Sequence, residues 1–492
     1  MSDALLIQLV LSLPVAASIF IAISGQYPNL REAFTLITST ALFIVVLMLY
    51  NSVSYGFRPE FVLIEPVAGL SLAFSIEPLG MLFSLVSSFL WIVTSIYSIG
   101  YMRGHNEKNQ TRFYVCFALA IASVMGIAFS ANMFTLFLFY ELLTLSTFFL
   151  VTHSGTDDAK RSGKLYLGIL LGTSIGLQLL AIIWTWSITG TLDFTQGGVF
   201  DNQVSKSVIA ILFALYIFGI GKAALMPFHR WLPAAMVAPT PVSALLHAVA
   251  VVKAGVFTVL KVTVYIFGFD TLIETNASIW LIYIASGTIL IASLIAMTKD
   301  NLKARLAYST ISQLSYIVLG ALLINETAFI GSSMHIAMHA FGKITLFFCA
   351  GAIMVATHKT EISQMHGLGR TMPITMAAFF IGSLSIIGLP PMGGMWSKWF
   401  LVLGTVEAGL YIPLAVLLIS SLLNIAYLLP IPIRAFYPAK DKMNELDDNT
   451  VVKEAPWPCL IAISITSLGC IALFLFPEPL YQLIALIFNK SY

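Results

Sequence analysis

Apolar runs about as long as a bilayer is thick recur along the whole chain. A helix needs about 20 mostly apolar residues to cross the hydrocarbon of a membrane. The sequence predicts fourteen such spans, at approximately residues 4–25, 33–53, 78–101, 113–130, 132–151, 163–188, 206–226, 239–267, 277–297, 303–324, 328–356, 373–402, 408–433 and 456–476. The pattern is therefore that of an all-α polytopic membrane protein.

The polar segments between these spans differ in charge. Loops after odd-numbered spans, with their edges, contain most of the basic residues: Arg31, Arg103, Lys108, Arg112, Lys160, Arg161, Lys164, Arg230, Lys299, Lys303, Arg305, Lys359, Arg370, Arg434, Lys440, Lys442 and Lys453. Segments after even-numbered spans contain only Arg58, Lys206 and Lys490. Cytoplasmic loops are enriched in Lys and Arg, so we expect the odd loops in the cytoplasm and both termini outside it. The segment 54–77 alternates weakly, which favours an extracytoplasmic hairpin over a helix.

Two of the predicted spans are interrupted by proline. The seventh continues from Gly221-Lys222 to Pro227, and the twelfth contains Gly388-Leu-Pro390-Pro391. Proline removes a backbone donor and clashes with the preceding turn, so both helices should break. The breaks lie five spans apart, which predicts two five-helix repeats of opposite orientation, as in inverted-repeat transporters. This divides the chain into N-terminal helices (1–112), a first repeat (113–267), a second repeat (277–433) and a C-terminal loop and helix (434–492).

Composition narrows the classes of function. The chain is 59% hydrophobic and only 10% charged, with a mean hydropathy of +0.92, whereas soluble domains are about 25% charged. The net charge of +2 and the lack of a basic cluster argue against nucleic acid as a partner. Four cysteines stand singly and no phosphate-binding glycine loop occurs, so we expect no metal and no cofactor. The N-terminus lacks the basic start of a cleaved signal peptide, and the first helix is expected to stay as an anchor.

Few charged residues lie inside the predicted spans. They are one acid, Glu141, and five bases, Lys222, Lys253, Lys261, Lys343 and Lys398. Each costs about 2.5–3.5 kcal/mol at a helix centre on insertion scales, so these side chains should face one another or water. Lys261 lies near a helix end, where a snorkelling or purely structural role is favoured. For the other five the sequence favours a proton path, because bases outnumber the acid and cannot all be neutralised in ion pairs.

Three histidines extend this set. His335, His339 and Lys343 are spaced i, i+4 and i+8, so they share one stripe of the eleventh span. The same spacing occurs in metal sites, but no acidic third ligand is nearby, and no second helix offers a matching haem ligand. His247 is either a further relay member or a hydrogen-bonded core histidine. We expect a lateral chain of protonatable groups, in which opening of a Glu141–Lys222 pair eases proton release.

The sequence around these charged residues resembles that of a known family. The matching stretches, between about residues 75 and 435, are Phe139-Tyr140-Glu141, Gly221-Lys222 through Trp231-Leu232-Pro233, Ala238-Pro-Thr-Pro-Val-Ser-Ala-Leu-Leu-His247-Ala248, Val252-Lys253-Ala254-Gly255 and Gly388-Leu-Pro-Pro-Met-Gly-Gly394. They resemble the antiporter-like membrane subunits of respiratory complex I and their relatives. Within that family, the chain length, the stretch Glu141–Thr147 with Val151-Thr-His153, and Lys398 are most similar to the D-type subunits of Mrp-type multisubunit Na⁺/H⁺ antiporters. Phe148-Phe149 departs from that pattern, so a related hydrogenase-linked or carbon-uptake complex stays open.

The resemblance implies a function and partners. It implies a proton path through Glu141, Lys222, Lys253, Lys343 and Lys398 in a non-redox transporter subunit of a prokaryotic plasma membrane. Other membrane subunits would be the partners, with H⁺ and Na⁺ as the transported ions. The alternatives are a proton-pumping subunit of a redox enzyme and a structural scaffold without a transport role.

Overall fold

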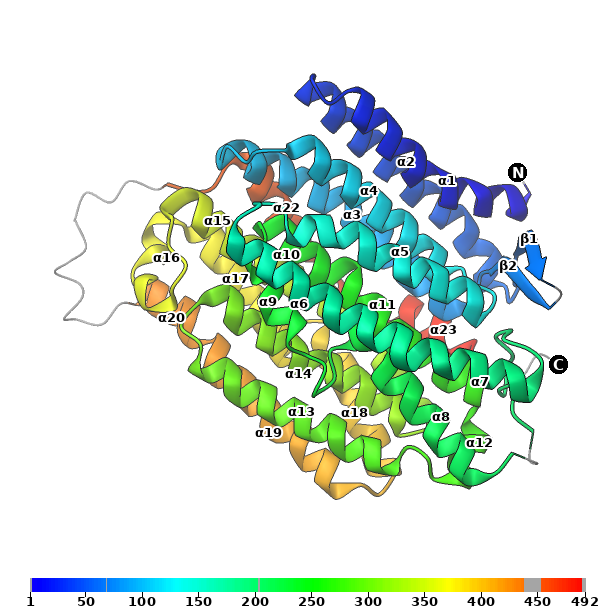
Figure 1. The fold of residues 1–492 in the computed structure, drawn as a ribbon. Coiled ribbons are helices and arrows are strands. Elements are labelled where there is room, and N and C mark those ends of the chain that lie inside the picture. Colours follow the sequence, from blue (N-terminus) through cyan, green and yellow to red (C-terminus); the bar gives the residue numbers. More distant parts are fainter. Residues whose placement is uncertain (1, 68, 202–203, 438–452, 489–492) are drawn as a thin grey trace.

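The chain is a bundle of long helices with one small hairpin (Figure 1). The computed structural model describes residues 2–67, 69–201, 204–437 and 453–488. Within these residues, eleven helical segments are long and apolar enough to cross a membrane. The other three predicted spans correspond to α8, to α14 and to the broken pair α17 and α18, so each of the fourteen predicted spans has its helical counterpart.

The N-terminal part holds three long helices and the hairpin. The helices are α1 (Asp3–Ile23), α2 (Pro28–Ser54) and α3 (Pro78–Gly104). Between α2 and α3, β1 (Glu60–Val67) and β2 (Leu70–Ser75) pair antiparallel, with Phe61 opposite Phe74. The hairpin expected over 54–77 is therefore confirmed.

The helices of the first predicted repeat begin at side-chain caps and contain irregular turns. Asn132 accepts a hydrogen bond from the backbone N–H of Thr135, and Thr156 accepts one from Ala159, which satisfies free donors at the helix starts. Because of the Thr156 cap, the sixth span begins six residues before the predicted position. The elements are α4 (Gln110–Ala128), α5 (Met133–Val151), α6 (Asp157–Thr173), a π-helical turn (Ser174–Gln178), α7 (Leu179–Thr189), α8 (Lys206–Gly219), α9 (Trp231–Ala234), α10 (Thr240–Ala244), a π-helical turn (Leu245–Val249), α11 (Val251–Lys261), a π-helical turn (Val262–Phe267) and α12 (Phe269–Thr275).

The second predicted repeat and the C-terminal part are more regular. Asn301 and Asn325 cap α14 and α15 in the same way as Asn132 caps α5. The elements are α13 (Ile279–Thr298), α14 (Leu302–Leu322), α15 (Glu326–Thr357), α16 (Leu368–Thr371), α17 (Pro373–Ile387), α18 (Gly394–Glu407), α19 (Tyr411–Leu428), α20 (Pro430–Phe436), α22 (Trp457–Leu475) and α23 (Glu478–Ala485).

Both proline breaks occur where they were predicted. The seventh span leaves the α-helix after Gly219, makes a 3₁₀ turn at Gly221–Ala223 and passes through Pro227 before α9. The twelfth span ends α17 at Ile387, passes through Pro390 and Pro391, and resumes at Gly394. Gly388 between them has φ +90°, and a Cβ there would lie 2.8 Å from Cδ of Lys398. A glycine is therefore needed both for the backbone turn and for the close approach of Lys398.

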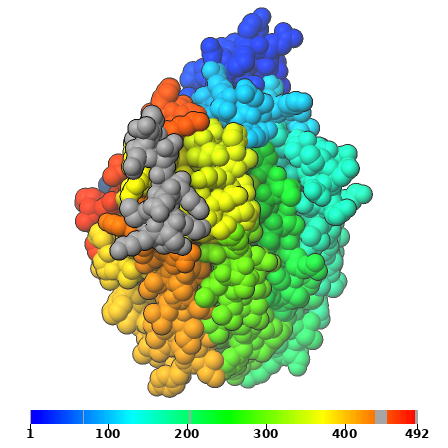
Figure 2. Space-filling model, turned by 90° about the vertical axis from the view of Figure 1, so that its left-hand side faces the viewer, coloured from blue at the N-terminus to red at the C-terminus, as the bar shows by residue number. Residues whose placement is uncertain are grey.

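The innermost helices are α11 and α15. The segment 240–267 is buried along its whole apolar window, and α15 packs against α14, α17, α18 and α22. In contrast, α1 and α2 protrude from the body (Figure 2), where the first predicted repeat (cyan to green) and the second (yellow-green to orange) occupy neighbouring halves. The hairpin lies at one end of the bundle and α16 and α20 at the other (Figure 1). Lys440, Lys442 and Lys490, which entered the loop-charge pattern, lie outside the described residues.

Candidate functional site

A hydrogen bond joins the two predicted repeats at the centre of the bundle. Nζ of Lys253 on α11 lies 2.7 Å from Nδ1 of His339 on α15, and both side chains are buried. His335 and His339 also lie together, with ring centroids 5.7 Å apart, as their spacing of four residues predicts. The innermost helix of each half thus contributes one member of a protonatable pair.

The contacts continue from His335 to Lys398. Nδ1 of His335 lies 2.8 Å from Oγ of Ser397 on α18, and its ring stacks on that of Tyr316 at 6.0 Å. Nζ of Lys398 lies 4.9 Å from the centroid of the same Tyr316 ring. The Tyr316 ring therefore contacts both the imidazole and the ammonium group, and its face favours a cation. Lys398 also donates to the carbonyl oxygen of Ile387, freed by the helix break, at 3.0 Å.

Lys343 lies on the same helix as the two histidines but has its own polar partners. Its Nζ donates to Oγ of Ser309 at 2.6 Å and to the carbonyl oxygen of Leu306 at 3.3 Å, both on α14. The hydroxyl of Tyr427 donates to Ser309 at 2.9 Å and also bonds Asn424. These groups hold a fully buried ammonium among neutral oxygens rather than beside a carboxylate.

Lys222 lies in the broken segment of the first half. Its Nζ donates to the carbonyl oxygen of Tyr140 at 2.8 Å and to Oγ1 of Thr144 at 2.6 Å, and it lies 3.1 Å from the Tyr140 ring centroid. The turn around Lys222 fits closely against α11, because a Cβ on Gly255 would lie 2.3 Å from the backbone of Lys222 and Ala223. The broken-helix lysine of each half thus faces a tyrosine ring, Tyr140 for Lys222 and Tyr316 for Lys398.

The expected ion pair between Glu141 and Lys222 is not formed. Both residues belong to the described part of the chain, yet no carboxylate oxygen of Glu141 lies within 4.0 Å of Nζ of Lys222. Both Glu141 oxygens are buried without a hydrogen-bond partner. The ion pair predicted from the sequence is therefore wrong, although Glu141 lies on the same face of α5 as Thr144, three residues further on.

His247 is buried near the same centre but stands apart from the hydrogen-bonded groups. Neither of its ring nitrogens has a hydrogen-bond partner, and its ring packs against Phe347 with centroids 4.6 Å apart. Of the two interpretations open from the sequence, a hydrogen-bonded core histidine is not observed. His247 as a relay member stays a prediction.

Lys261, for which the sequence favoured a structural role, is fully buried. Its Nζ forms an ion pair with Glu77 at 3.1 Å and donates to the carbonyl oxygen of Ser130 at 2.7 Å. Glu77 directly precedes α3, so it was not counted among the acids inside spans. The pair was missed because its two members are far apart in sequence and one lies at a helix start.

The arrangement brings several groups that can exchange protons close to one another. Lysine, histidine, serine and tyrosine side chains all can donate and, when deprotonated or neutral, accept a proton. The sequence did not identify the hydroxyl partners, because serine and threonine inside helices usually bond their own backbone. These partners are Tyr140, Thr144, Ser309, Tyr316, Ser397 and Tyr427. Among the described residues, no three His, Cys, Asp or Glu side chains converge as metal ligands would.

Sequence comparison identifies the family to which this chain belongs. Residues 130–424 match the family described as "NADH:quinone oxidoreductase/Mrp antiporter, TM", and residues 66–114 match the N-terminal family of complex I chain 5. The chain belongs to this family of antiporter-like membrane subunits. The matched region contains all the buried protonatable residues described above, which we call the central row: Glu141, Lys222, Lys253, Lys343 and Lys398, with His247, His335 and His339.

Individual relatives of this antiporter-like subunit come from several complexes. NADH-quinone oxidoreductase subunit N of Desulforudis audaxviator is 31% identical over 416 residues, which is 82% of each chain. NAD(P)H-quinone oxidoreductase chain 5 of a Synechocystis species is 33% identical over 347 residues, but the match spans only about half of that longer relative, 49%. The resemblance stated from the motifs is thus confirmed at the level of the family.

Two solved structures share the fold of the antiporter-like subunit. A chain of the Mrp complex from a Dietzia species superimposes with a TM-score of 0.84 at 21% identity, over 99% of this chain and 96% of that one. A chain of the archaeal membrane-bound sulfane sulfur reductase superimposes with a TM-score of 0.85 at 23% identity, over 98% and 96%. The fold is therefore that of a multi-pass subunit found in multisubunit membrane complexes.

Proposed function

We propose that this chain is the proton-translocating subunit of a multisubunit antiporter that exchanges Na⁺ or another monovalent cation for H⁺. The observation that carries the proposal is the run of contacts from Lys253 through His339 and His335 to Tyr316 and Lys398. It crosses from one half of the molecule to the other through its most buried helices. A scaffold would gain nothing from buried lysines that cost several kcal/mol each.

The proton path would consist of the five charged residues with the histidines between them. Glu141, Lys222, Lys253, Lys343 and Lys398 would carry protons, with His247, His335 and His339 as secondary members. The driving interaction is electrostatic, because a proton that arrives on one lysine repels the positive charge on the next. The breaks at Pro227, Pro390 and Pro391 free carbonyl oxygens, such as that of Ile387, which hold the lysines in place.

Sodium would pass largely through another subunit. A sodium site needs several oxygen atoms around one point, but the row contains a single carboxylate, Glu141, and its neighbours are mostly cationic. This chain would therefore carry H⁺ while other membrane subunits carry Na⁺. Robust Na⁺ flux through vesicles that contain this chain alone would contradict this division.

The placement in the membrane follows from the loop charges. The basic loops would face the cytoplasm of a prokaryote, and both termini and the hairpin would lie outside its plasma membrane. The two halves, 113–267 and 277–433, would be inverted repeats. Their support is the matching pair of broken helices and the matching lysine–tyrosine contacts, Lys222 with Tyr140 and Lys398 with Tyr316.

A second candidate is a proton-pumping subunit of a redox complex. Its support is the 31% identity to NADH-quinone oxidoreductase subunit N over most of both chains. The same row would then carry protons, with electron transfer in other subunits as the driving force.

Purification of the intact complex distinguishes the two candidates. We expect small membrane subunits to copurify, and a Na⁺ gradient across proteoliposomes to move protons, which a pH-sensitive dye reports. Copurified flavin and iron–sulfur subunits, with proton movement only after an electron donor is added, would favour the redox complex instead. A scaffold role would leave exchange intact in assembled Lys398→Ala and Glu141→Ala complexes, and loss of exchange in both would exclude it.

A further inference from the structure

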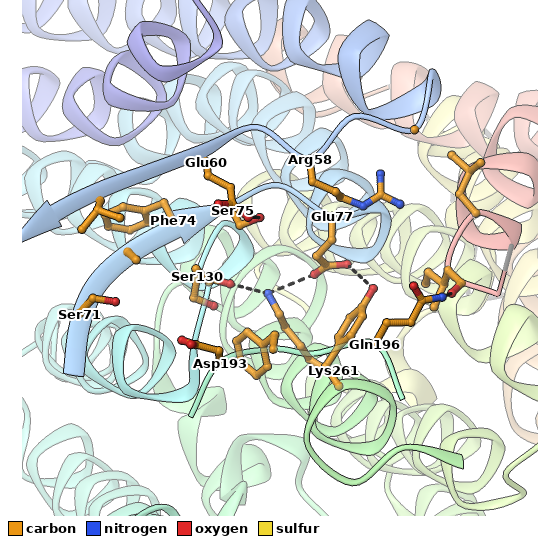
Figure 3. Close-up of a pocket in the computed structure, with 18 residues that line it drawn as sticks. Arg58, Glu60, Ser71, Phe74, Ser75, Glu77, Ser130, Asp193, Gln196 and Lys261 are labelled. Carbon is orange, nitrogen blue, oxygen red and sulfur yellow. Dashed lines mark hydrogen bonds and ion pairs between the residues drawn. The ribbon is translucent and has the colours of Figure 1, made fainter. Parts of the chain in front are cut away.

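A cavity of about 490 Å³ opens at the hairpin end of the molecule, away from the central row. Its rim contains the exposed side chains of Arg58, Glu60 and Asp193, and its floor contains Glu77 and Lys261 (Figure 3). The hairpin, the start of α3 and the end of α11 thus meet around a charged pocket. None of the residues of the central row lines it.

The floor of the cavity is a buried acid–base pair. Nζ of Lys261 lies 3.1 Å from a carboxylate oxygen of Glu77, and the hydroxyl of Tyr265 donates to the other oxygen at 3.2 Å (Figure 3). The lysine is completely buried and the glutamate is 7% exposed. The carboxylate also caps α3, because it accepts the backbone N–H groups of Leu79 and Gly80 at 2.8 and 3.2 Å. The cap accounts for an acid at this position but not for the buried lysine paired with it.

Lys261 of this pair lies on the same helix as Lys253. Lys253 and Lys261 are eight residues apart on α11, a rise of about 12 Å, and the residue midway between them is Phe257. The Phe257 ring is fully buried, lies 5.4 Å from Nζ of Lys261 and packs against Phe83 with centroids 5.0 Å apart. The Phe257 ring therefore lies on the helix between Lys253 and the charged cavity.

We propose that this cavity is the vestibule through which the proton path opens to the hairpin side, with Lys261 and Glu77 as its last two carriers. This inference rests on the proposed function, since it presupposes that the central row carries protons. When Lys253 is protonated, its charge repels that of Lys261, which gives its proton to the Glu77 carboxylate. The carboxylic acid releases that proton to water in the cavity, and neutral Lys261 then takes the proton of Lys253 through water that enters between them when Phe257 moves aside. Each transfer breaks one N–H or O–H bond and forms another, and the original ion pair is restored.

A cysteine label at the cavity wall tests the proposal. Ser75 lines the cavity on β2, whereas Leu63 lies on β1, is 59% exposed and does not line it. The intact complex carrying Ser75→Cys or Leu63→Cys is treated with a cationic methanethiosulfonate and reconstituted with a Na⁺ gradient. We expect full labelling of both, and at least about a tenfold slower proton exchange only for labelled Ser75→Cys, because the added charge disturbs proton transfer at the pair. The four native cysteines are buried, so labelled wild-type complex gives the reference rate.

A double variant separates transport from stability. Glu77→Gln with Lys261→Met removes both charges together, so no unpaired charge stays buried, and the glutamine oxygen can still accept the backbone N–H groups at the start of α3. We expect the assembled double variant to lose exchange. Normal exchange in it, or in fully labelled Ser75→Cys, would overturn the vestibule, as would a Ser75→Cys thiol that the reagent does not reach. If the wild-type complex itself shows no exchange, the proposed function fails instead.

Discussion

Nζ of Lys253 and Nδ1 of His339 lie 2.7 Å apart in the most buried part of the bundle. Two full positive charges at that distance would repel strongly in a medium of low dielectric constant. The contact therefore holds a lysine and a histidine that together carry at least one proton fewer than their maximum. Either nitrogen can be the donor, so the proton can change sides without large movement of either helix.

A His339→Gln variant tests this contact. Glutamine keeps a hydrogen bond to Lys253 but does not exchange protons, so we expect the complex to assemble with exchange reduced by about 10²-fold or more. Met338→Leu, the next buried residue of α15, is the matched control and should keep the wild-type rate. The measurement is dye-reported proton movement in proteoliposomes. Equal rates in both variants would remove His339 from the path.

Substitutions of Glu141 and of Glu32 should have opposite effects on stability and on transport. Because the Glu141 carboxylate is buried without a hydrogen bond, Glu141→Gln should leave the melting temperature unchanged or raise it, while exchange falls. Glu32 forms ion pairs with Arg31 and Arg103 near the start of α2. Glu32→Gln should therefore cost at least about 1 kcal/mol of stability and leave exchange unchanged. The measurements are thermal unfolding of the purified complex and proton exchange in vesicles. Lower stability with normal exchange in Glu141→Gln, or normal stability with lost exchange in Glu32→Gln, would contradict these expectations.

The fold was predictable because the membrane imposes a simple rule on apolar length. Backbone polar groups must be satisfied within the segment, so each apolar run of sufficient length becomes a helix. Proline located the breaks at Pro227 and Pro390, and weak alternation of apolar and polar residues located the hairpin. Hydropathy does not predict helix caps or local changes in helix type. It therefore missed the start of α6 at Asp157 and the π-helical turns in 240–267.

The site was predictable only in part. Buried charge has a high cost, so Lys222, Lys253, Lys343 and Lys398 stand out from an apolar sequence. Their partners do not, because Thr144 or Ser309 resembles any other hydroxyl residue inside a helix. The Glu141–Lys222 ion pair was wrong because sequence does not give the distance between side chains on different helices. The Lys261–Glu77 pair was missed because its members are far apart in sequence and Glu77 lies at a helix start.

Tyr316 tests whether an aromatic ring connects His335 with Lys398. Tyr316→Phe keeps the ring contacts with both groups and loses the hydrogen bonds of the hydroxyl with the carbonyl oxygen of Leu417, at 3.1 Å, and with Oγ of Ser421, at 3.5 Å. We expect a loss of about 1 kcal/mol in stability and near-normal exchange. Tyr316→Leu removes the ring face and should slow exchange clearly more than Tyr316→Phe does. Equal exchange in the two assembled variants would show that the ring has no part in transfer.

Gly255 tests the fit that positions Lys222. A Cβ at this position would lie 2.3 Å from the backbone of Lys222 and Ala223, atoms that cannot move without displacing the turn. Overpacking of this kind costs about 1–3 kcal/mol, so Gly255→Ala should lower the melting temperature of the complex.

Exchange should fall as well in Gly255→Ala, because Nζ of Lys222 would move from its contacts with Tyr140 and Thr144. Gly168 on α6 is the matched control, since it is exposed and a Cβ there meets no atom within 4 Å. Alanine favours a helix over glycine by about 1 kcal/mol, so Gly168→Ala should be neutral or stabilising with normal exchange. If Gly255→Ala behaved like Gly168→Ala in both measurements, the close packing of α11 against the Lys222 turn would not determine the position of this lysine.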